Sequence, residues 1–517
     1  MMATVPPSHP PFCFLHLCRL SGPSSPLSPF HLSHILILYT AVSYSALPRS
    51  CCLAYKSLRP HAMDVLPAYP NTHGVDKKEE EYDVDAEKRD IMAGQVQDAF
   101  GSEEDAEIKY KTLTWWQCGL LMICESVSLG VLSLPAAVAT LGLVPGVILI
   151  VGLGLLALYT GYNIGLFRQR YPHIQSLADA GEILLGRFGR ELFGLGQFLF
   201  CIFVMGSHIL TFRVMMNTIT EHGTCSIVFS VVGMVISMVL SIPRTMKGMT
   251  WVSFASFLSI FGAVMVTMIS VGVQEHPDRI IHATVETNLY TGFQAVSNIV
   301  FAYCAHVAFF GLIAEMENPK DFNKSLLMLQ SFEICLYLTA AVVIYYYVGT
   351  DVHSPALTSA GPVMKKVAYG LAIPTIVGAG VVNGHIGLKY IYFRACRKSD
   401  LLHSRSWKSV GIWLALGLTC WVVAWIISEG IPVFSNLNSL ISALFASWFS
   451  YGLSGIYWLH LNYGEWFSSP KKILLTILNI GIALIGLILC ALGLYASGTA
   501  IHNDASSTVF TCANTDT

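Results

Sequence analysis

A single acidic residue, Glu125, lies within a long apolar segment near the start of the hydrophobic part of the sequence. The residues that follow it are small or disfavour a helix: Ser126, Ser128, Gly130, Ser133 and Pro135. A carboxyl group in a hydrocarbon layer is costly to bury and is usually functional. Because a carboxyl group can bind and release a proton, we interpret Glu125 as a candidate proton carrier. A structural hydrogen bond to a neighbouring helix is the alternative.

A second apolar segment carries polar residues at its centre. It reads FAYCAHVAFFGLIAEM and contains Tyr303, Cys304 and His306. In hydrocarbon an unpaired backbone group costs several kcal/mol, so an interrupted helix persists only where it lines a cavity or packs within protein. Two interrupted helices at corresponding positions of two halves therefore predict a binding site between them. The alternative is that the small residues only allow close packing of helices.

The composition places both segments in a membrane. The chain has 517 residues, of which 54% are apolar and 12% are charged, and its mean hydropathy is +0.58. Soluble domains carry about 25% charged residues, so one large soluble protein is excluded. The basic residues form no patch, which excludes a nucleic-acid-binding surface. The 14 cysteines form no CxxC pair and no Cys/His ligand spacing, and no HExxH, GxSxG or HxxxxD motif occurs. The sequence therefore predicts no metal site, no cofactor and no enzyme.

Eleven apolar runs follow one another from residue 113, each long enough for the roughly 20 residues that a bilayer requires. They lie near residues 114–139, 143–167, 190–220, 224–242, 250–273, 291–315, 325–349, 363–393, 407–429, 433–457 and 471–498. The sequence thus predicts an all-α polytopic membrane protein with eleven transmembrane helices. The interrupted runs are the first and the sixth, as expected for a five-plus-five inverted repeat with one further helix.

Lysine and arginine residues in the connections predict the orientation. With a cytoplasmic N-terminus, sixteen of them lie in the inner connections and three in the outer ones. An odd number of spans then places the C-terminus outside. Cys225 and Cys512 both fall outside in this topology, where they could pair. We interpret Arg213, Glu333 and Glu429 as snorkelling or interfacial residues.

The N-terminal part of the chain differs from its apolar centre. Residues 1–62 contain nine prolines and no acidic residue, and we expect a disordered leader or a start assigned too early, with Met63 as the better initiator. Residues 63–112 include 13 acidic and 4 basic residues between positions 76 and 107, which predicts an acidic cytoplasmic tail. Residues 113–498 form the predicted transmembrane domain, and residues 499–517 a short extracytoplasmic tail.

Two segments carry a resemblance to a known family. WWQCGLLMICESVSLGVLSLPAAVATLG and FAYCAHVAFFGLIAEM resemble the first and sixth helices of the amino acid/auxin permease family, most closely its fungal neutral amino acid permeases. The resemblance covers residues 113–498 and implies a transporter with a leucine-transporter-like fold and alternating access. Family members usually carry Gly-x-Gly at the first break. Here the first glycine is replaced by Ser128, so only Gly130 carries over.

The resemblance implies a site for the two charged ends of an amino acid. Backbone N–H groups of the first break would hold the carboxylate, and carbonyl groups of the second break would hold the ammonium. This agrees with the helix dipole, because helix N-termini favour anions and helix C-termini favour cations. The implied substrate-binding residues are Ser126, Val127, Ser128, Leu129, Gly130, Phe301, Ala302, Tyr303, Cys304, Ala305 and His306.

The eighth run contributes the segment VVNGHIGLKYIY, with Asn383 and His385 as candidate coupling partners of Glu125. For His385, a packing role is the alternative. Sodium-coupled transporters of the resembling fold use serine or threonine hydroxyls on this helix, and residues 376–393 contain neither. We therefore expect coupling to protons, while a sodium site built from backbone oxygens stays open.

Together, these features predict a proton-coupled secondary active transporter of amino acids that functions as a monomer in the bilayer. Neutral substrates are expected because the first break carries no acidic residue apart from Glu125. Aromatic substrates are included because Phe301, Tyr303, Phe309 and Phe310 could line a large pocket. The plasma membrane is favoured over the vacuole. The alternatives are a vacuolar exporter, a channel, and a receptor that binds amino acids without transporting them.

Overall fold

The structure is a computed structural model that describes residues 111–243, 249–274, 277, 279–396, 406–503 and 509–513. The expected leader, 1–62, and nearly all of the expected acidic tail, 63–112, lie outside the described residues. All described residues belong to the unit Asp85–Thr517.

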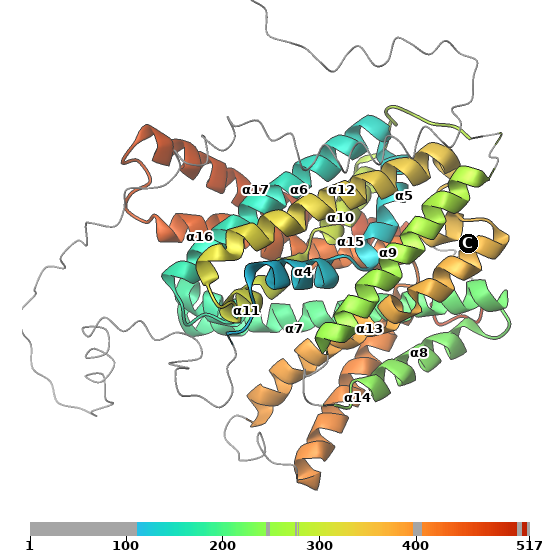
Figure 1. The fold of residues 1–517 in the computed structure, drawn as a ribbon, viewed down its shortest axis with the longest axis horizontal. Coiled ribbons are helices and arrows are strands. Elements are labelled where there is room, and N and C mark those ends of the chain that lie inside the picture. The colour runs from blue at the N-terminus through green and yellow to red at the C-terminus, as the bar shows by residue number, and fades with distance from the viewer. Residues whose placement is uncertain are drawn as a thin grey trace, which may run out of the picture. The chain divides into compact units, whose positions relative to one another are not determined.

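The described residues form helices and loops (Figure 1), with one isolated β-bridge between Leu113 and Met316. The α-helices are α4 (Trp115–Ser126), α5 (Leu134–Leu141), α6 (Leu143–Arg170), α7 (Leu177–Thr220), α8 (Ser226–Leu240), α9 (Met249–Val273), α10 (Leu289–Ala302), α11 (Phe309–Ala314), α12 (Phe322–Val348), α13 (Pro362–Cys396), α14 (Trp407–Gly430), α15 (Phe434–Ile441), α16 (Leu453–Leu461) and α17 (Pro470–Asn503). A π-helical segment, Ser442–Gly452, joins α15 to α16.

Most of these helices are long and apolar enough to cross a membrane. In the part of the chain that the structure describes, nine helices meet this criterion, and the bent pair of α4 with Leu129–Leu141 makes ten. The expected all-α polytopic membrane protein is confirmed. Helix α8, the fourth predicted span, has 15 residues, fewer than the roughly 20 that a bilayer requires. The count of eleven spans therefore stays a prediction.

The two interrupted helices lie inside the helix bundle. Helix α12 packs against α4 and α6, and α10 packs against α5, α15 and α17 (Figure 1). Helix α7 is mostly buried, whereas less than a third of the apolar part of α14 and of α17 is buried, which suits α14 and α17 to contact lipid. The backbone at the two interruptions is therefore surrounded by protein, as unpaired polar groups in a membrane require.

Helix α7 contains a bend at Gly186, whose φ of 62° and ψ of −149° are not helical. A positive φ is readily adopted by glycine because it has no β-carbon. The bend separates the first nine residues of the element, Leu177–Leu185, from the long buried part that forms one wall of the cavity described below.

The C-terminal segment is joined covalently to the start of α8. Cys225 and Cys512 form a disulfide, with their Cα atoms 4.4 Å apart. The Ser226 hydroxyl donates a hydrogen bond to the carbonyl of Ala513 (3.0 Å), and the Phe510 ring lies 5.7 Å from the Trp425 ring of α14. The pairing that the sequence left open therefore occurs in the structure.

Three charged residues lie deeper than the sequence indicated. Arg213, Glu333 and Glu429 are 2%, 0% and 1% exposed, so the interfacial interpretation was wrong. Arg213 and Glu429 neutralise each other at 3.6 Å, and Arg213 also donates to the carbonyl of Pro432 (2.9 Å). Charged side chains are fully buried when they find such partners. A sequence cannot reveal these partners when they lie on separate helices.

Candidate functional site

The first break begins where α4 ends. The backbone leaves the helical region at Val127 (φ −76°, ψ 91°) and Ser128 (φ −138°, ψ −129°). A short 3₁₀ turn, Leu129–Ser133, then leads into α5, and the two halves are bent by 46°. The first N–H groups of a helical segment have no partner within that segment. The N–H groups at the start of this turn therefore point along its axis toward the first break.

The second break begins where α10 ends. Tyr303 and Cys304 are not helical, and a 3₁₀ turn over Ala305–Ala308 leads into α11. The carbonyl of Ala302 accepts a hydrogen bond from the Tyr337 hydroxyl (3.1 Å), and that of Tyr303 accepts one from the Ser450 hydroxyl (3.4 Å). A carbonyl oxygen has two lone pairs, so these groups retain the capacity to accept from a cation.

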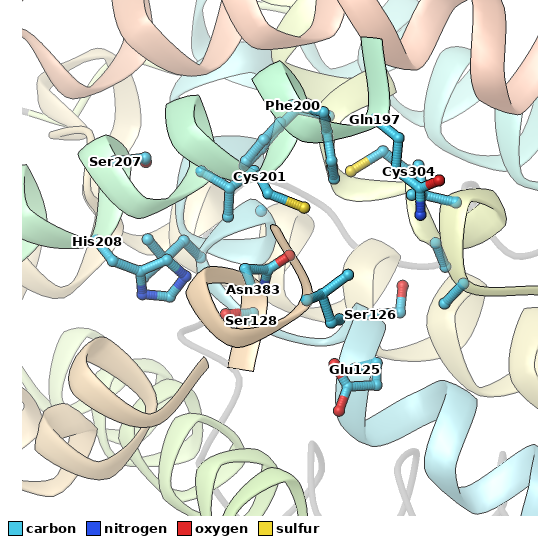
Figure 2. Close-up of a pocket in the computed structure, with 18 residues that line it drawn as sticks. Glu125, Ser126, Ser128, Gln197, Phe200, Cys201, Ser207, His208, Cys304 and Asn383 are labelled. Atoms are coloured by element: carbon cyan, nitrogen blue, oxygen red, sulfur yellow. The ribbon is translucent and has the colours of Figure 1, made fainter. Parts of the chain in front are cut away.

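A cavity of about 120 Å³ lies between the two breaks, α7 and α13 (Figure 2). Its lining comprises Glu125, Ser126, Ser128, Leu129, Gly130, Gln197, Phe200, Cys201, Val204, Ser207, His208, Phe301, Cys304, Ala305, Val307, Ala308, Asn383 and Ile386. A water molecule occupies about 30 Å³ of liquid volume, so the cavity has room for a small solute. Residues of both breaks therefore face this cavity.

Nine of the fourteen residues expected at the site line this cavity: Glu125, Ser126, Ser128, Leu129, Gly130, Phe301, Cys304, Ala305 and Asn383. The other five, Val127, Ala302, Tyr303, His306 and His385, do not line it. Of the four aromatic residues expected around a large pocket, Phe301 lines the cavity, while Tyr303, Phe309 and Phe310 are buried elsewhere.

The two expected histidines face other helices. His306 Nε2 lies 3.0 Å from the Thr160 hydroxyl and 3.1 Å from the carbonyl of Ala157, both on α6. His385 packs edge-on against Trp413 of α14, with ring centroids 5.3 Å apart. Both histidines are fully buried. The geometry therefore favours packing roles, and a role in binding or coupling stays a prediction for each.

Helix α7 supplies a wall of the cavity that the sequence analysis missed. Gln197, Phe200, Cys201, Ser207 and His208 follow one another along this helix in Figure 2, opposite the ribbon that carries Glu125. Residues at positions i, i+3, i+4 and i+7 share one face of a helix. The polar residues at that spacing within an apolar run were the signal that could have found them.

Two side-chain oxygens in the cavity have no hydrogen-bond partner among the described residues, Ser128 Oγ and Gln197 Oε1. Other polar groups of the lining are engaged. The Ser253 hydroxyl of α9 donates to Glu125, Asn383 donates to the carbonyl of Ala379 (3.0 Å), and His208 Nδ1 lies 2.9 Å from the carbonyl of Ile376. Buried polar atoms are normally paired, so the two unpaired oxygens mark where a bound solute could make hydrogen bonds.

The charge of the cavity is low. Among the described residues that line it, Glu125 is the only acidic one, and none is a lysine or an arginine. Within the same part of the chain, no group of three or more His, Cys, Asp or Glu side chains is arranged to hold a metal ion. The site therefore combines one carboxyl group, unpaired hydrogen-bonding atoms and the ends of two interrupted helices, which together suit a small dipolar solute.

Comparisons with known proteins agree on one family. The model of the family described as transmembrane amino acid transporter protein matches residues 111–499. The chain is 36% identical over 416 residues to the N amino acid transport system protein of Neurospora crassa, covering 78% of this chain and 88% of the relative. It is 26% identical over 266 residues to an amino acid transporter of Arabidopsis thaliana, covering 49% of this chain and 61% of the relative.

Among solved structures, the chain is similar to a Na⁺-coupled sialic acid symporter in a substrate-bound outward-open state. The TM-score is 0.46 at 11% sequence identity, and the match covers 76% of this chain and 90% of that chain.

Proposed function

This chain belongs to the transmembrane amino acid transporter protein family, and from that premise we propose that it is a proton-coupled transporter of neutral amino acids that works by alternating access. The family expected from the sequence is confirmed, and its members are transporters rather than enzymes. Proton coupling, neutral substrates and alternating access are the proposed part.

The observation that carries the proposal is the cavity between two helix breaks. Ser128, Leu129 and Gly130 line it from the first break, and Phe301, Cys304 and Ala305 line it from the second. Helix ends of opposite polarity attract opposite charges, so the carboxylate of an amino acid would bind at the first break and its ammonium group at the second. The unpaired Ser128 hydroxyl supports the carboxylate subsite.

The character of the cavity wall supports neutral substrates. Phe200, Cys201, Val204 and Ile386 present apolar surface, which would favour an uncharged side chain of the substrate. A cationic side chain would have Glu125 as its one carboxylate partner, and an anionic side chain would meet no lysine or arginine among the described lining residues. Aromatic substrates are included in the proposal, with Phe200 and Phe301 as their contacts.

Glu125 is the proposed carrier of the coupling proton. It lines the cavity next to Ser126, and its described hydrogen-bond partner is the neutral hydroxyl of Ser253. A carboxylate without a cationic partner is costly in a membrane, so its charge is best removed by a proton taken from water in the cavity. Asn383 lines the same cavity and is the proposed polar partner.

The disulfide supports the proposed orientation. Disulfides form in oxidising compartments, and Cys225 and Cys512 both fall on the outer side when the N-terminus is cytoplasmic. The excess of lysine and arginine in the opposite connections agrees with this arrangement. We propose that the chain functions as a monomer in the plasma membrane.

Uptake of a labelled neutral amino acid into proteoliposomes, with and without an inward pH gradient, tests the proposal. A proton-coupled transporter accumulates the label when the gradient is present and exchanges it by counterflow when it is absent. Equal uptake in both conditions would contradict proton coupling. Saturable binding without uptake would instead indicate a receptor. Competition by unlabelled amino acids would then order the substrates, and preference for cationic ones would contradict the neutral class.

A further inference from the structure

Glu333 of α12 is a buried carboxyl group that lies between the two helix breaks. It is 0% exposed and accepts a hydrogen bond from the hydroxyl of Ser126, the last residue of α4. One turn further along α12, the Tyr337 hydroxyl donates to the carbonyl of Ala302, the last residue of α10 (3.1 Å). One turn of α12 therefore contacts the end of the first half of both interrupted helices.

The Tyr337 hydroxyl lies between two acceptors. Its oxygen is 3.1 Å from the Ala302 carbonyl oxygen and 3.5 Å from Glu333 Oε1. A phenol has a single hydrogen to donate, and hydrogen bonds to a charged acceptor are roughly twice as strong as those to a neutral one. The charge on Glu333 therefore decides which of the two acceptors receives this hydrogen.

Glu333 has no cationic partner in the part of the chain that the structure describes. Its hydrogen-bonding neighbours are the neutral side chains of Ser126 and Tyr337, and its other oxygen, Oε2, has no hydrogen-bond partner among the described residues. The titratable groups near it are two further phenols and a thiol: Tyr303, Tyr451 and Cys304. None of these groups carries a positive charge in any protonation state.

Another buried glutamate provides the contrast. Glu429 is 1% exposed and has Arg213 3.6 Å away as a counter-ion. A buried carboxyl group can be neutralised by a cation or by a proton. Arg213 supplies the cation that neutralises Glu429, whereas Glu333 has no such cation among the described residues and is neutralised by a proton.

We propose that Glu333 is a second proton-binding site, whose protonation controls the contact between α12 and the second break. Binding of one proton converts the Glu333 carboxylate to the carboxylic acid, and Tyr337 then donates to Ala302, as in the structure. Loss of that proton to water, through the cavity-lining residue Ser126, draws the Tyr337 hydrogen to Glu333. The Ala302 carbonyl loses its donor at the break proposed to hold the substrate ammonium. The effect on substrate binding rests on the proposed transport function, whereas the proton site itself does not.

Infrared difference spectroscopy of the full chain in lipid tests the proton site without any transport measurement. A protonated carboxyl group has a carbonyl stretching band that shifts in heavy water. Glu333→Gln should remove such a band, while Glu125→Gln should leave this band in place. The exposed residue Glu221, paired with Lys366, provides the control Glu221→Gln, which should also leave it. A spectrum unchanged by Glu333→Gln would overturn the proposal.

Transport measurements test the consequence. Glu333→Gln can still accept from Ser126 but cannot titrate, so pH-driven accumulation should be lost and the rate of counterflow exchange should no longer vary with pH. Tyr337→Phe keeps the ring that packs against Tyr303 and should likewise lose the pH dependence of exchange. It should also shift the Glu333 band, which keeps the test available if Glu333→Gln does not fold.

Normal pH-driven accumulation by Glu333→Gln would overturn the proposal. Absence of amino acid uptake by the wild type, with the Glu333 band present, would contradict the proposed function alone.

Discussion

Gly130 of the first break lies directly against Ala302 of the second. A β-carbon at Gly130 would lie 2.6 Å from the Cα atom of Ala302 and 3.3 Å from its backbone nitrogen. The obstacle is backbone, which cannot move away as the end of a flexible side chain can. Glycine at position 130 is therefore required for the close approach of the two interrupted helices, in addition to any contact with substrate.

Gly130→Ala should force the two breaks apart. We expect loss of stability by about 1–3 kcal/mol, the usual cost of overpacking, together with reduced uptake, because the cavity is formed by the segments that move. Thermal unfolding in detergent and uptake in proteoliposomes measure the two effects. Gly152→Ala on α6, where a β-carbon meets no atom within 4 Å, is the matched control and should reduce neither stability nor uptake. Full uptake and stability in Gly130→Ala would contradict the close packing.

Glu125→Gln keeps the size of the side chain and its capacity to accept from Ser253, but it cannot titrate. If Glu125 carries the coupling proton, this variant should lose accumulation driven by an inward pH gradient and still perform counterflow exchange. Both are measured in the same proteoliposomes at matched protein amounts. Accumulation at the wild-type level would remove Glu125 as the carrier, and joint loss of folding and exchange would favour a structural role.

Ser128→Ala removes a cavity hydroxyl that has no partner among the described residues. A hydrogen bond to a charged group contributes about 1.5–3 kcal/mol, so the substrate Kd should rise by about tenfold to a hundredfold. Ser133→Ala is the comparison, because the Ser133 hydroxyl donates to the carbonyl of Gly130 (2.8 Å) instead. That variant should lower stability more than affinity. An unchanged Kd in Ser128→Ala would exclude this hydroxyl from the carboxylate subsite.

Glu429→Gln should leave the guanidinium of Arg213 buried without its counter-ion. Breaking a buried ion pair in this way costs about 3–5 kcal/mol, so the melting temperature should fall clearly. The double variant Arg213→Met with Glu429→Gln removes both charges and should recover part of that loss. If the melting temperature of Glu429→Gln equals that of the wild type, the ion pair at 3.6 Å contributes little to stability.

The disulfide provides a test of orientation. After mild reduction, Cys225 and Cys512 should react with a membrane-impermeant maleimide added outside intact cells, whereas unreduced protein should not. The double variant Cys225→Ser with Cys512→Ser is the control for labelling of the other cysteines. Labelling that requires permeabilised cells would place the C-terminus on the cytoplasmic side and contradict the proposed topology.

The positions of the two helix breaks could be read from the sequence because they depend on local chemistry. Glycine, serine and proline weaken a helix wherever they cluster, and the length of an apolar run is set by the thickness of the bilayer. The cluster of small residues placed the first interruption at Ser126–Gly130, and the polar residues Tyr303, Cys304 and His306 within an apolar run placed the second, where the structure has them. The resemblance to a known family then implied which residues of the two breaks bind substrate, and most of those residues line one cavity.

The partners of those residues required the tertiary structure. Ser126 meets Glu333 across 207 positions of sequence, and Ser253 meets Glu125 across 128. His306 faces α6 rather than the cavity, and the cavity wall on α7 belongs to a helix that the sequence treated as an ordinary span. The rotation of each helix about its axis decides which side chains face one another. Inside a bilayer that rotation is set by packing against neighbouring helices, and an apolar run with few charges carries little information about it.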